Sequence, residues 1–83
     1  MFICVPKYDG YSFKFQWDEN FSIKCSVNDD SSVIIEANSA GLISLARHLL
    51  ELSQENVPNS YHFHLDEYNS LDDNSAELIV VKK

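Results

Sequence analysis

The sequence has 83 residues, of which 45% are hydrophobic and 12% aromatic, and its formal net charge at pH 7 is −7. This length predicts a single domain over residues 1–83 with a modest core, and the apolar content excludes a disordered chain. The charge is uneven, because residues 25–81 contain ten acidic residues and only one basic residue, Arg47. Such a surface repels phosphate backbones, which argues against nucleic acid as a partner.

No apolar run approaches the ~20 residues that a membrane-spanning helix needs. The first residues, "MFICVPK", have neither the basic lead nor the apolar length of a signal peptide. We therefore expect a protein without a membrane contact that works in the cytoplasm. Cys4 and Cys25 are too few for a disulfide framework, and we expect both to be reduced, buried thiols.

The first half of the chain alternates with a period of two. In "YSFKFQW" (11–17) and "FSIKCSV" (21–27), apolar and polar residues take turns, which predicts two half-buried strands. The short link between them predicts an antiparallel hairpin. "VIIEA" (33–37) is expected to be a third strand, and "FICV" (2–5) a short edge strand that ends before a proline.

The period changes over residues 39–54, where leucines form one broad side of an expected helix and polar residues the other. Asn38 is placed to cap the helix start, and Pro58 lies just beyond its end. We expect the leucine side to pack on the sheet, so that Leu49→Ala should cost ~2–4 kcal/mol of stability. We expect His48, on the polar side, to be exposed to solvent.

The last third returns to strands, at "YHFHL" (61–65) and "AELIVV" (76–81). The order of strands, helix and two strands predicts an α+β fold. We expect a mainly antiparallel sheet of five or six strands, with one amphipathic helix packed on one face. One helix covers so wide a sheet poorly, so both a monomer and a homodimer remain open.

A histidine pair stands out in the expected strand 61–65. His62 and His64 project from one face, Asp66 continues that face, and zinc and copper enzymes use this spacing. Neighbouring side chains on one face lie ~6.6–7 Å apart, so a tetrahedral site would also need a residue from another strand, such as Glu77. We expect no metal and no other cofactor, but a small metal-binding or hydrolytic domain built on this His-x-His pair is the alternative function.

Other catalytic patterns are missing from the sequence. It has no glycine-rich phosphate loop and no G-x-S-x-G elbow, and neither cysteine lies near a histidine along the chain. We therefore assign no catalytic residue and expect a protein that is not an enzyme.

The acidic segment after the histidines has the composition of a protein contact, with Tyr68 and Leu71 as apolar anchors among carboxylates that would steer a partner. In the opposing interpretation, both anchors pack back on the sheet edge and the carboxylates are merely solvated. The candidate contact residues are His48, His64, Asp66, Glu67, Tyr68, Leu71, Asp72 and Asp73.

The run "ANSAGLISLARHLLELSQENVPNSYHFHLDEYNSLDDNSAELIVVKK" (37–83) resembles the bacterial immunity protein 32 family of polymorphic toxin systems. The resemblance is carried by a small-residue turn into "GLISLARHLL", then "VP", "YHFHLDEYNSL" and a closing "AELIV". It implies a small cytoplasmic protein that binds and neutralises a cognate protein toxin. An acidic surface would suit a toxin with a basic groove, and a nuclease is one candidate.

Overall fold

The computed structural model describes all 83 residues. Its elements follow the order β1 (Ile23–Val27), β2 (Val33–Ala37), α1 (Ser39–Leu52), β3 (His62–Leu65) and β4 (Leu78–Val81). The fold is α+β, with strands, one helix and two final strands, but the expected sheet of five or six strands is wrong. The four strands form two separate two-stranded antiparallel sheets, β1–β2 and β3–β4.

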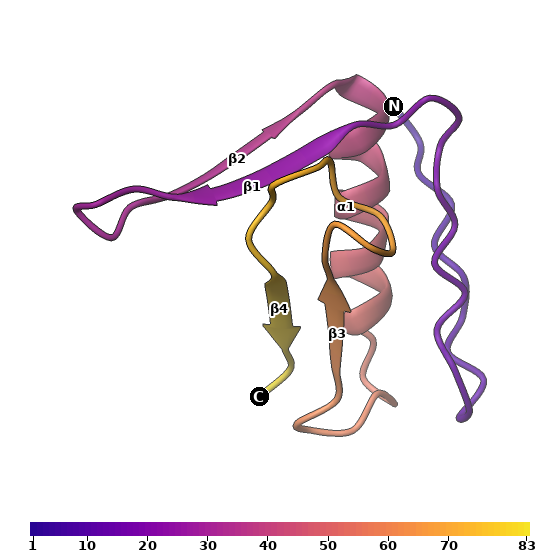
Figure 1. Cartoon of the computed structure of the whole chain (residues 1–83). Helices are drawn as coiled ribbons and strands as arrows, with labels where there is room; N and C mark the ends of the chain where they lie inside the picture. Colours follow the sequence, from indigo (N-terminus) through magenta and orange to yellow (C-terminus); the bar gives the residue numbers. More distant parts are fainter.

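The first sheet is a hairpin that projects from the body of the molecule, and we call residues 23–37 the hairpin arm (Figure 1). β1 pairs with β2 rather than with residues 11–17, so the expected first hairpin is wrong. The other edge of β1 binds the segment that precedes β4. There, the Asp72 N–H donates to Ile23 O, and the Ala76 N–H donates to Cys25 O.

Residues 1–21, which we call the N-terminal strap, contain no strand, so the strands expected at residues 2–5 and 11–17 are wrong. No main-chain group of the strap bonds another main-chain group. The strap runs along α1, turns near Gly10 and returns beside itself (Figure 1). Its alternation still indicates which side chains point inward, because Phe13, Phe15 and Trp17 pack against the core.

The helix occupies its expected residues but is rotated about its axis from the expected orientation. Its polar residues Ser44, His48 and Glu51 are all fully buried, whereas Leu49 is 43% exposed. Only part of the leucine side faces the core, because Leu52 is buried and Leu45 packs against the core. The prediction that His48 is solvated is wrong. The large cost predicted for Leu49→Ala is no longer expected either.

The strap explains this rotation. A segment without a β-ladder needs other partners for its polar main-chain groups, since an unpaired buried group costs about 1–3 kcal/mol. The polar side of α1 supplies those partners, and Gln54, just beyond the helix end, extends the series. The bonds run from Asp18 N–H to Ser44 Oγ (2.8 Å), from Lys14 N–H to Glu51 Oε2 (2.8 Å) and from Tyr8 N–H to Gln54 Oε1 (3.1 Å).

The core lies between α1, the strap, the inner face of β3 and the end of the hairpin arm that joins the body, which we call the arm base. Its buried members are Ile23, Cys25, Leu52, Val57, Phe63, Leu65 and Leu71. Gly41 allows the arm base to approach the helix closely, because a Cβ at this position would lie 2.4 Å from Ser22 O. Asn38 caps α1 as expected, accepting from the Gly41 N–H at 2.8 Å.

Cys25 is buried as expected, but Cys4 on the strap is exposed, and both are free thiols. The structure contains no helix with the length and apolar content required to cross a bilayer.

Candidate functional site

The acidic loop, residues 66–77, connects β3 to β4 and is built on Asp66. The carboxylate of Asp66 accepts from the main-chain N–H groups of Tyr68 (2.9 Å) and Asn69 (3.1 Å), and its carbonyl accepts from Leu71 N–H (2.9 Å). This is the local turn that aspartate favours. Asp66 is therefore a turn-forming residue whose carboxylate is already engaged by the main chain.

Leu71 fixes the middle of the acidic loop to the body. Its side chain is 5% exposed and belongs to the core, so it anchors the loop. The loop is also tied to the arm base, because Ser75 Oγ accepts from Cys25 N–H at 3.2 Å beside the two main-chain bonds of β1. A loop held at its start, middle and end presents its outward side chains in a fixed geometry.

Tyr68 shows the opposite behaviour to Leu71. Its side chain is 91% exposed, and its ring packs on no other aromatic ring. The interpretation that both anchors pack back on the sheet thus describes Leu71 but not Tyr68. An aromatic side chain left in water on a fixed loop offers area that a partner can bury.

The carboxylates of Glu67, Asp72 and Asp73 are not paired with any basic side chain. Glu67 accepts from the Asn74 N–H (2.8 Å) and Asp72 from the Ser22 hydroxyl (2.7 Å), whereas Asp73 is exposed. Two ion pairs of the structure lie elsewhere, at Lys14–Asp9 and Arg47–Asp18, and the third joins Glu77, at the end of the loop, to His64. Glu67, Asp72 and Asp73 therefore leave the loop with negative charge that no ion pair neutralises.

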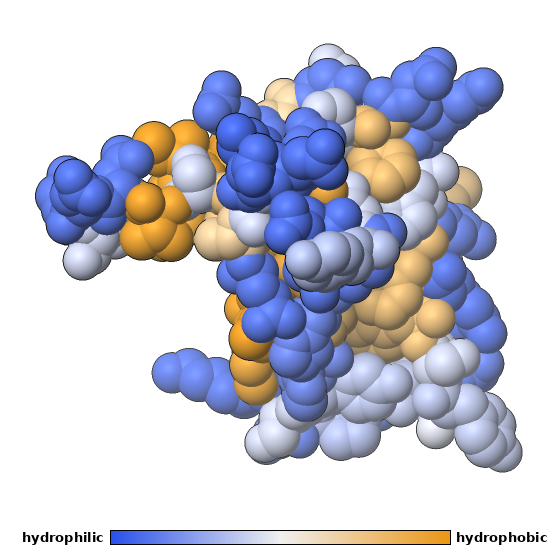
Figure 2. Space-filling view, viewed as in Figure 1, coloured by the Kyte–Doolittle hydropathy of each residue, from blue (hydrophilic) through white to orange (hydrophobic).

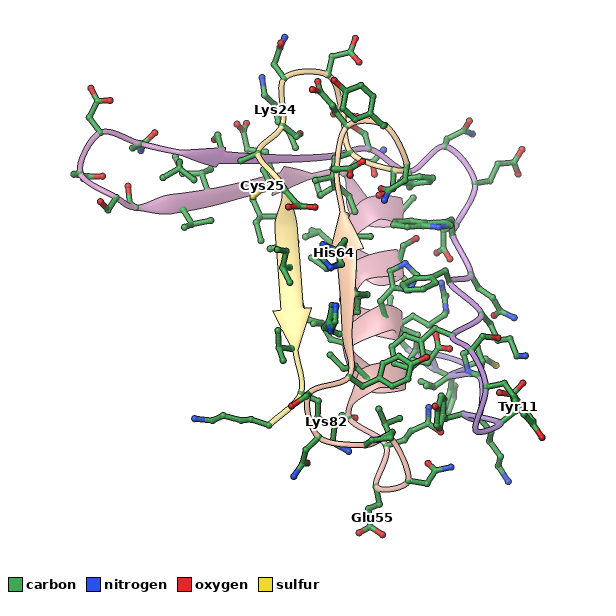
Figure 3. The ribbon with its side chains drawn as sticks, turned by 60° about the horizontal axis from the view of Figure 1, so that its bottom comes forward. Tyr11, Lys24, Cys25, Glu55, His64 and Lys82 are labelled. Carbon is green, nitrogen blue, oxygen red and sulfur yellow. The ribbon has the colours of Figure 1, made fainter.

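His64 lies on β3 below this loop, with its side chain directed outward (Figure 3). Its Nδ1 lies 3.1 Å from Glu77 Oε2, and its ring centroid lies 5.0 Å from that of His62. Glu77 is the neighbour that the sequence indicates for this face. No group of three or more His, Cys, Asp and Glu side chains is close enough to hold a metal ion.

His48 is far from being a surface residue. Its ring is enclosed by aromatic rings, with centroids 4.3 Å from Trp17 and 5.2 Å from Phe15. Neither ring nitrogen has a hydrogen-bond partner. Burial lowers the pKa of His48 to about 4, with a further contribution from the positive charge of Arg47, so the ring is neutral at pH 7.

A hollow of about 230 Å³ lies between the strap and the acidic loop. The strap contributes Phe15 and Trp17, and the other wall consists of His64, Leu65, Asn69 and Ser70. The sequence does not indicate this hollow, because the strap comes to the loop only through tertiary packing. The only signal in the sequence is the alternation of aromatic residues in the strap, which is typical of a strand.

A family model described as "Immunity protein 32" matches residues 32–83, more than half of the chain. The chain belongs to the immunity protein 32 family. The part that matches this family contains β2, α1, β3, the acidic loop and β4, whereas the strap and β1 precede it. No curated protein and no solved structure matches the chain.

Proposed function

We propose that this protein neutralises a cognate toxin by binding it through the acidic loop, without any chemistry of its own. The observation that carries the proposal is Tyr68, which is 91% exposed on a loop that Leu71 and the arm base hold in place. Membership of the immunity protein 32 family supports a toxin as the partner. Leu71 and His48 act from inside the fold, by holding the loop and packing the strap.

The outward carboxylates of the loop are proposed to give orientation and a fast association rate. Asp72 and Asp73 follow Tyr68 along the loop and form no ion pair, although Lys24 lines a shallow hollow together with Asp72. Complementary charge raises association rates by ~10–10³-fold. The proposed toxin therefore presents a basic surface, as a nuclease does to its substrate. Binding would take place in the cytoplasm, where such a toxin meets its target.

The hollow beside the loop is proposed to receive one side chain of the toxin. Its volume of about 230 Å³ suits a single large side chain, and Trp17 and Phe15 form one wall. An arginine fits this description, because its guanidinium stacks on aromatic rings and is attracted by the nearby carboxylates. On the other wall, Ser70 Oγ donates to Asn69 Oδ1 and keeps lone pairs that would accept a hydrogen bond from the guanidinium.

The metal-binding or hydrolytic alternative is not supported by a comparable arrangement. His62 and His64 are both exposed on β3, and the one carboxylate bonded to them is that of Glu77. Two histidines and one partly exposed acid do not make the enclosed three-ligand site that catalytic zinc uses.

The experiment is kinetic measurement of binding to the toxin encoded beside this protein's gene, at several salt concentrations. Tyr68→Ala should speed dissociation by at least ~10-fold, because a central aromatic residue contributes mainly to complex lifetime. The double variant Asp72→Asn with Asp73→Asn should slow association and weaken its salt dependence. An asparagine at position 72 can still accept from the Ser22 hydroxyl, so the loop should keep its conformation.

Two matched controls are available in the chain. Tyr11 is 87% exposed at the turn of the strap, and Asp29 and Asp30 lie at the tip of the hairpin arm. Tyr11→Ala and the double change Asp29→Asn with Asp30→Asn alter the same chemistry at remote places, and both should bind with parental rates. If the loop variants also bind with parental rates, the toxin contacts another surface and the proposal is wrong.

A further inference from the structure

The outer edge of β4 has no strand beside it. β4 pairs only with β3, and Lys82 N–H, directly after it, donates to Tyr61 O on the β3 side. Since main-chain groups alternate along a strand, those of Ile79 and Val81 point toward the bare edge. Within its four residues, LIVV, β4 has neither a proline nor a charge and is strongly strand-forming. The first charge, Lys82, is directed inward, where its Nζ donates to Gln54 O (2.6 Å) and Val57 O (2.8 Å).

The side of α1 that lies toward β4 is also exposed to solvent. Figure 1 shows the strap on one side of α1 and β4 on the other. Because the strap contacts Ser44 and Glu51, helical geometry turns Leu42 and Leu49 toward the β4 side. These leucines are 53% and 43% exposed, and Ile79 and Val81 are 47% and 56% exposed. Figure 2 shows apolar residues along β4 and on the hairpin arm above it.

We propose that a second copy of this chain covers this edge, with the two β4 strands paired antiparallel about a two-fold axis. The result is one four-stranded sheet, β3–β4–β4–β3, with both helices on its inner face. Four strands at about 4.8 Å spacing are about 19 Å wide, which matches two helices of about 10 Å each. Leu42 and Leu49 of the two copies would then face each other beneath the joined sheet.

The alternation of β4 restricts the register of this pairing. Residues directly opposite each other must lie on the same face, so the axis passes through Ile79 or Val80. An axis at Val80 places Glu77 of each copy opposite Lys83 of the other, so that two opposite charges meet twice. An axis at Ile79 places Glu77 opposite an apolar residue, Val81. The charges therefore select the pairing centred on Val80.

Charge also indicates a second copy rather than a basic partner. Two of only six basic residues in a chain of net charge −7, Lys82 and Lys83, follow β4 directly. Lys82 Nζ is held inward by Gln54 O and Val57 O, so the exposed Lys83 presents its charge at this end of the edge. A basic partner would be repelled at this end of the edge, whereas an acidic chain such as this one is attracted. In a pairing about a two-fold axis, both copies also use the same surface, so the bare edge of each copy is covered by that of the other.

The hairpin arm adds to the same interface. It projects beyond β4 on the side of the bare edge in both views (Figures 1 and 3). Val27, Val33 and Ile35 lie on the arm face that Ile23 and Cys25 occupy nearer the body, and they are 59%, 60% and 39% exposed. In the two-fold arrangement, each arm would pass over the second copy and bury these side chains.

The first test is sedimentation velocity of the whole chain over a dilution series. We expect a dimer that dissociates on dilution. Glu77→Lys and Lys83→Glu should each raise the dimer Kd by at least ~10-fold, since each change puts like charges opposite each other at two symmetric places. The double variant with both changes should return the Kd to near the parental value, which no effect on folding alone would produce.

The second test is hydrogen exchange at β4. The N–H groups of Ile79 and Val81 should be protected in concentrated parental protein and unprotected on dilution or in Ile79→Lys. Because the Ile79 side chain is exposed, Ile79→Lys should keep the parental melting curve at the lowest concentration. A parental chain that stays monomeric at high concentration overturns the proposal, as does a double variant that fails to restore the dimer. Loss of toxin binding by a monomeric Ile79→Lys would assign the edge to the toxin instead.

Discussion

On the strap flank of α1, the side chains of Ser44 and Glu51 are polar and completely buried, whereas on the β4 flank Leu42 and Leu49 are apolar and half exposed. The usual distribution of an amphipathic helix is thus partly reversed. The strap flank is covered by a segment that needs hydrogen-bond partners, and the β4 flank is not covered within one chain. What a helix buries depends on what lies against it, and not on the polarity of its residues alone.

The largest effect should come from comparing two leucines on one helix. Leu52 is 4% exposed in the core, and Leu49 is 43% exposed on the β4 flank. Leu52→Ala should lower the free energy of unfolding by about 3 kcal/mol, and Leu49→Ala by less than about 1 kcal/mol in the monomer. Urea unfolding at low protein concentration measures both. Equal losses would mean that the β4 flank is covered within the single chain.

A second prediction uses pH to act on the strap side alone. His48 has a pKa of about 4 in the folded protein and an ordinary value of 6.5 when unfolded. The unfolded chain therefore takes up a proton first, and stability present above pH 6.5 is lost as the pH falls toward 4. The loss should reach about 3 kcal/mol, measured as the change in unfolding free energy between pH 7 and pH 4.

The control for this prediction is the histidine pair of β3. His48→Phe should remove the loss, because the new ring does not titrate, whereas His62→Gln at an exposed position should retain it. Asp9, whose pKa is lowered to about 2 by the Lys14 hydrogen bond, contributes in a separate window below pH 4. A His48→Phe protein with the parental pH dependence would show that another group titrates.

The smallest effect concerns a single strap bond. Ser44→Ala removes the acceptor of the Asp18 N–H, and we expect a loss of about 1 kcal/mol, with faster hydrogen exchange confined to the strap. Ser53→Ala removes a similar hydroxyl that bonds Leu50 O at the exposed helix end, and the strap should not respond to it. If both variants leave strap exchange unchanged, packing of Trp17 and Phe15 holds the strap and the hydrogen bonds do not.

The sequence predicted those elements that local patterns define. The strand over residues 33–37, the helix from Ser39 and its Asn38 cap follow from alternation, from helical spacing and from a side chain that bonds the first turn. The acidic loop was also predictable, since Asp66 and the polar residues after it favour turns. These features depend on neighbours a few residues apart, and no distant contact alters them.

Features that depend on distant contacts were predicted wrongly. The alternation in residues 11–17 is real, but a strand also needs a partner, and α1 takes the main-chain groups that a partner would use. Polarity alone predicts that the leucines of α1 are buried, but Leu42 and Leu49 are half exposed. His48 is predicted to be solvated from its residue type, and the acidic surroundings of Leu71 leave its burial open, but both side chains are buried.

The side-chain bonds of the strap also bear on the order in which the protein folds. They join residues 26, 37 and 46 positions apart, whereas the arm closes through a turn of a few residues and α1 through contacts four residues apart. Closing a long loop costs entropy before any contact repays it. The arm and α1 should therefore form early. The strap should dock last, on a helix whose polar side chains are already aligned on one side.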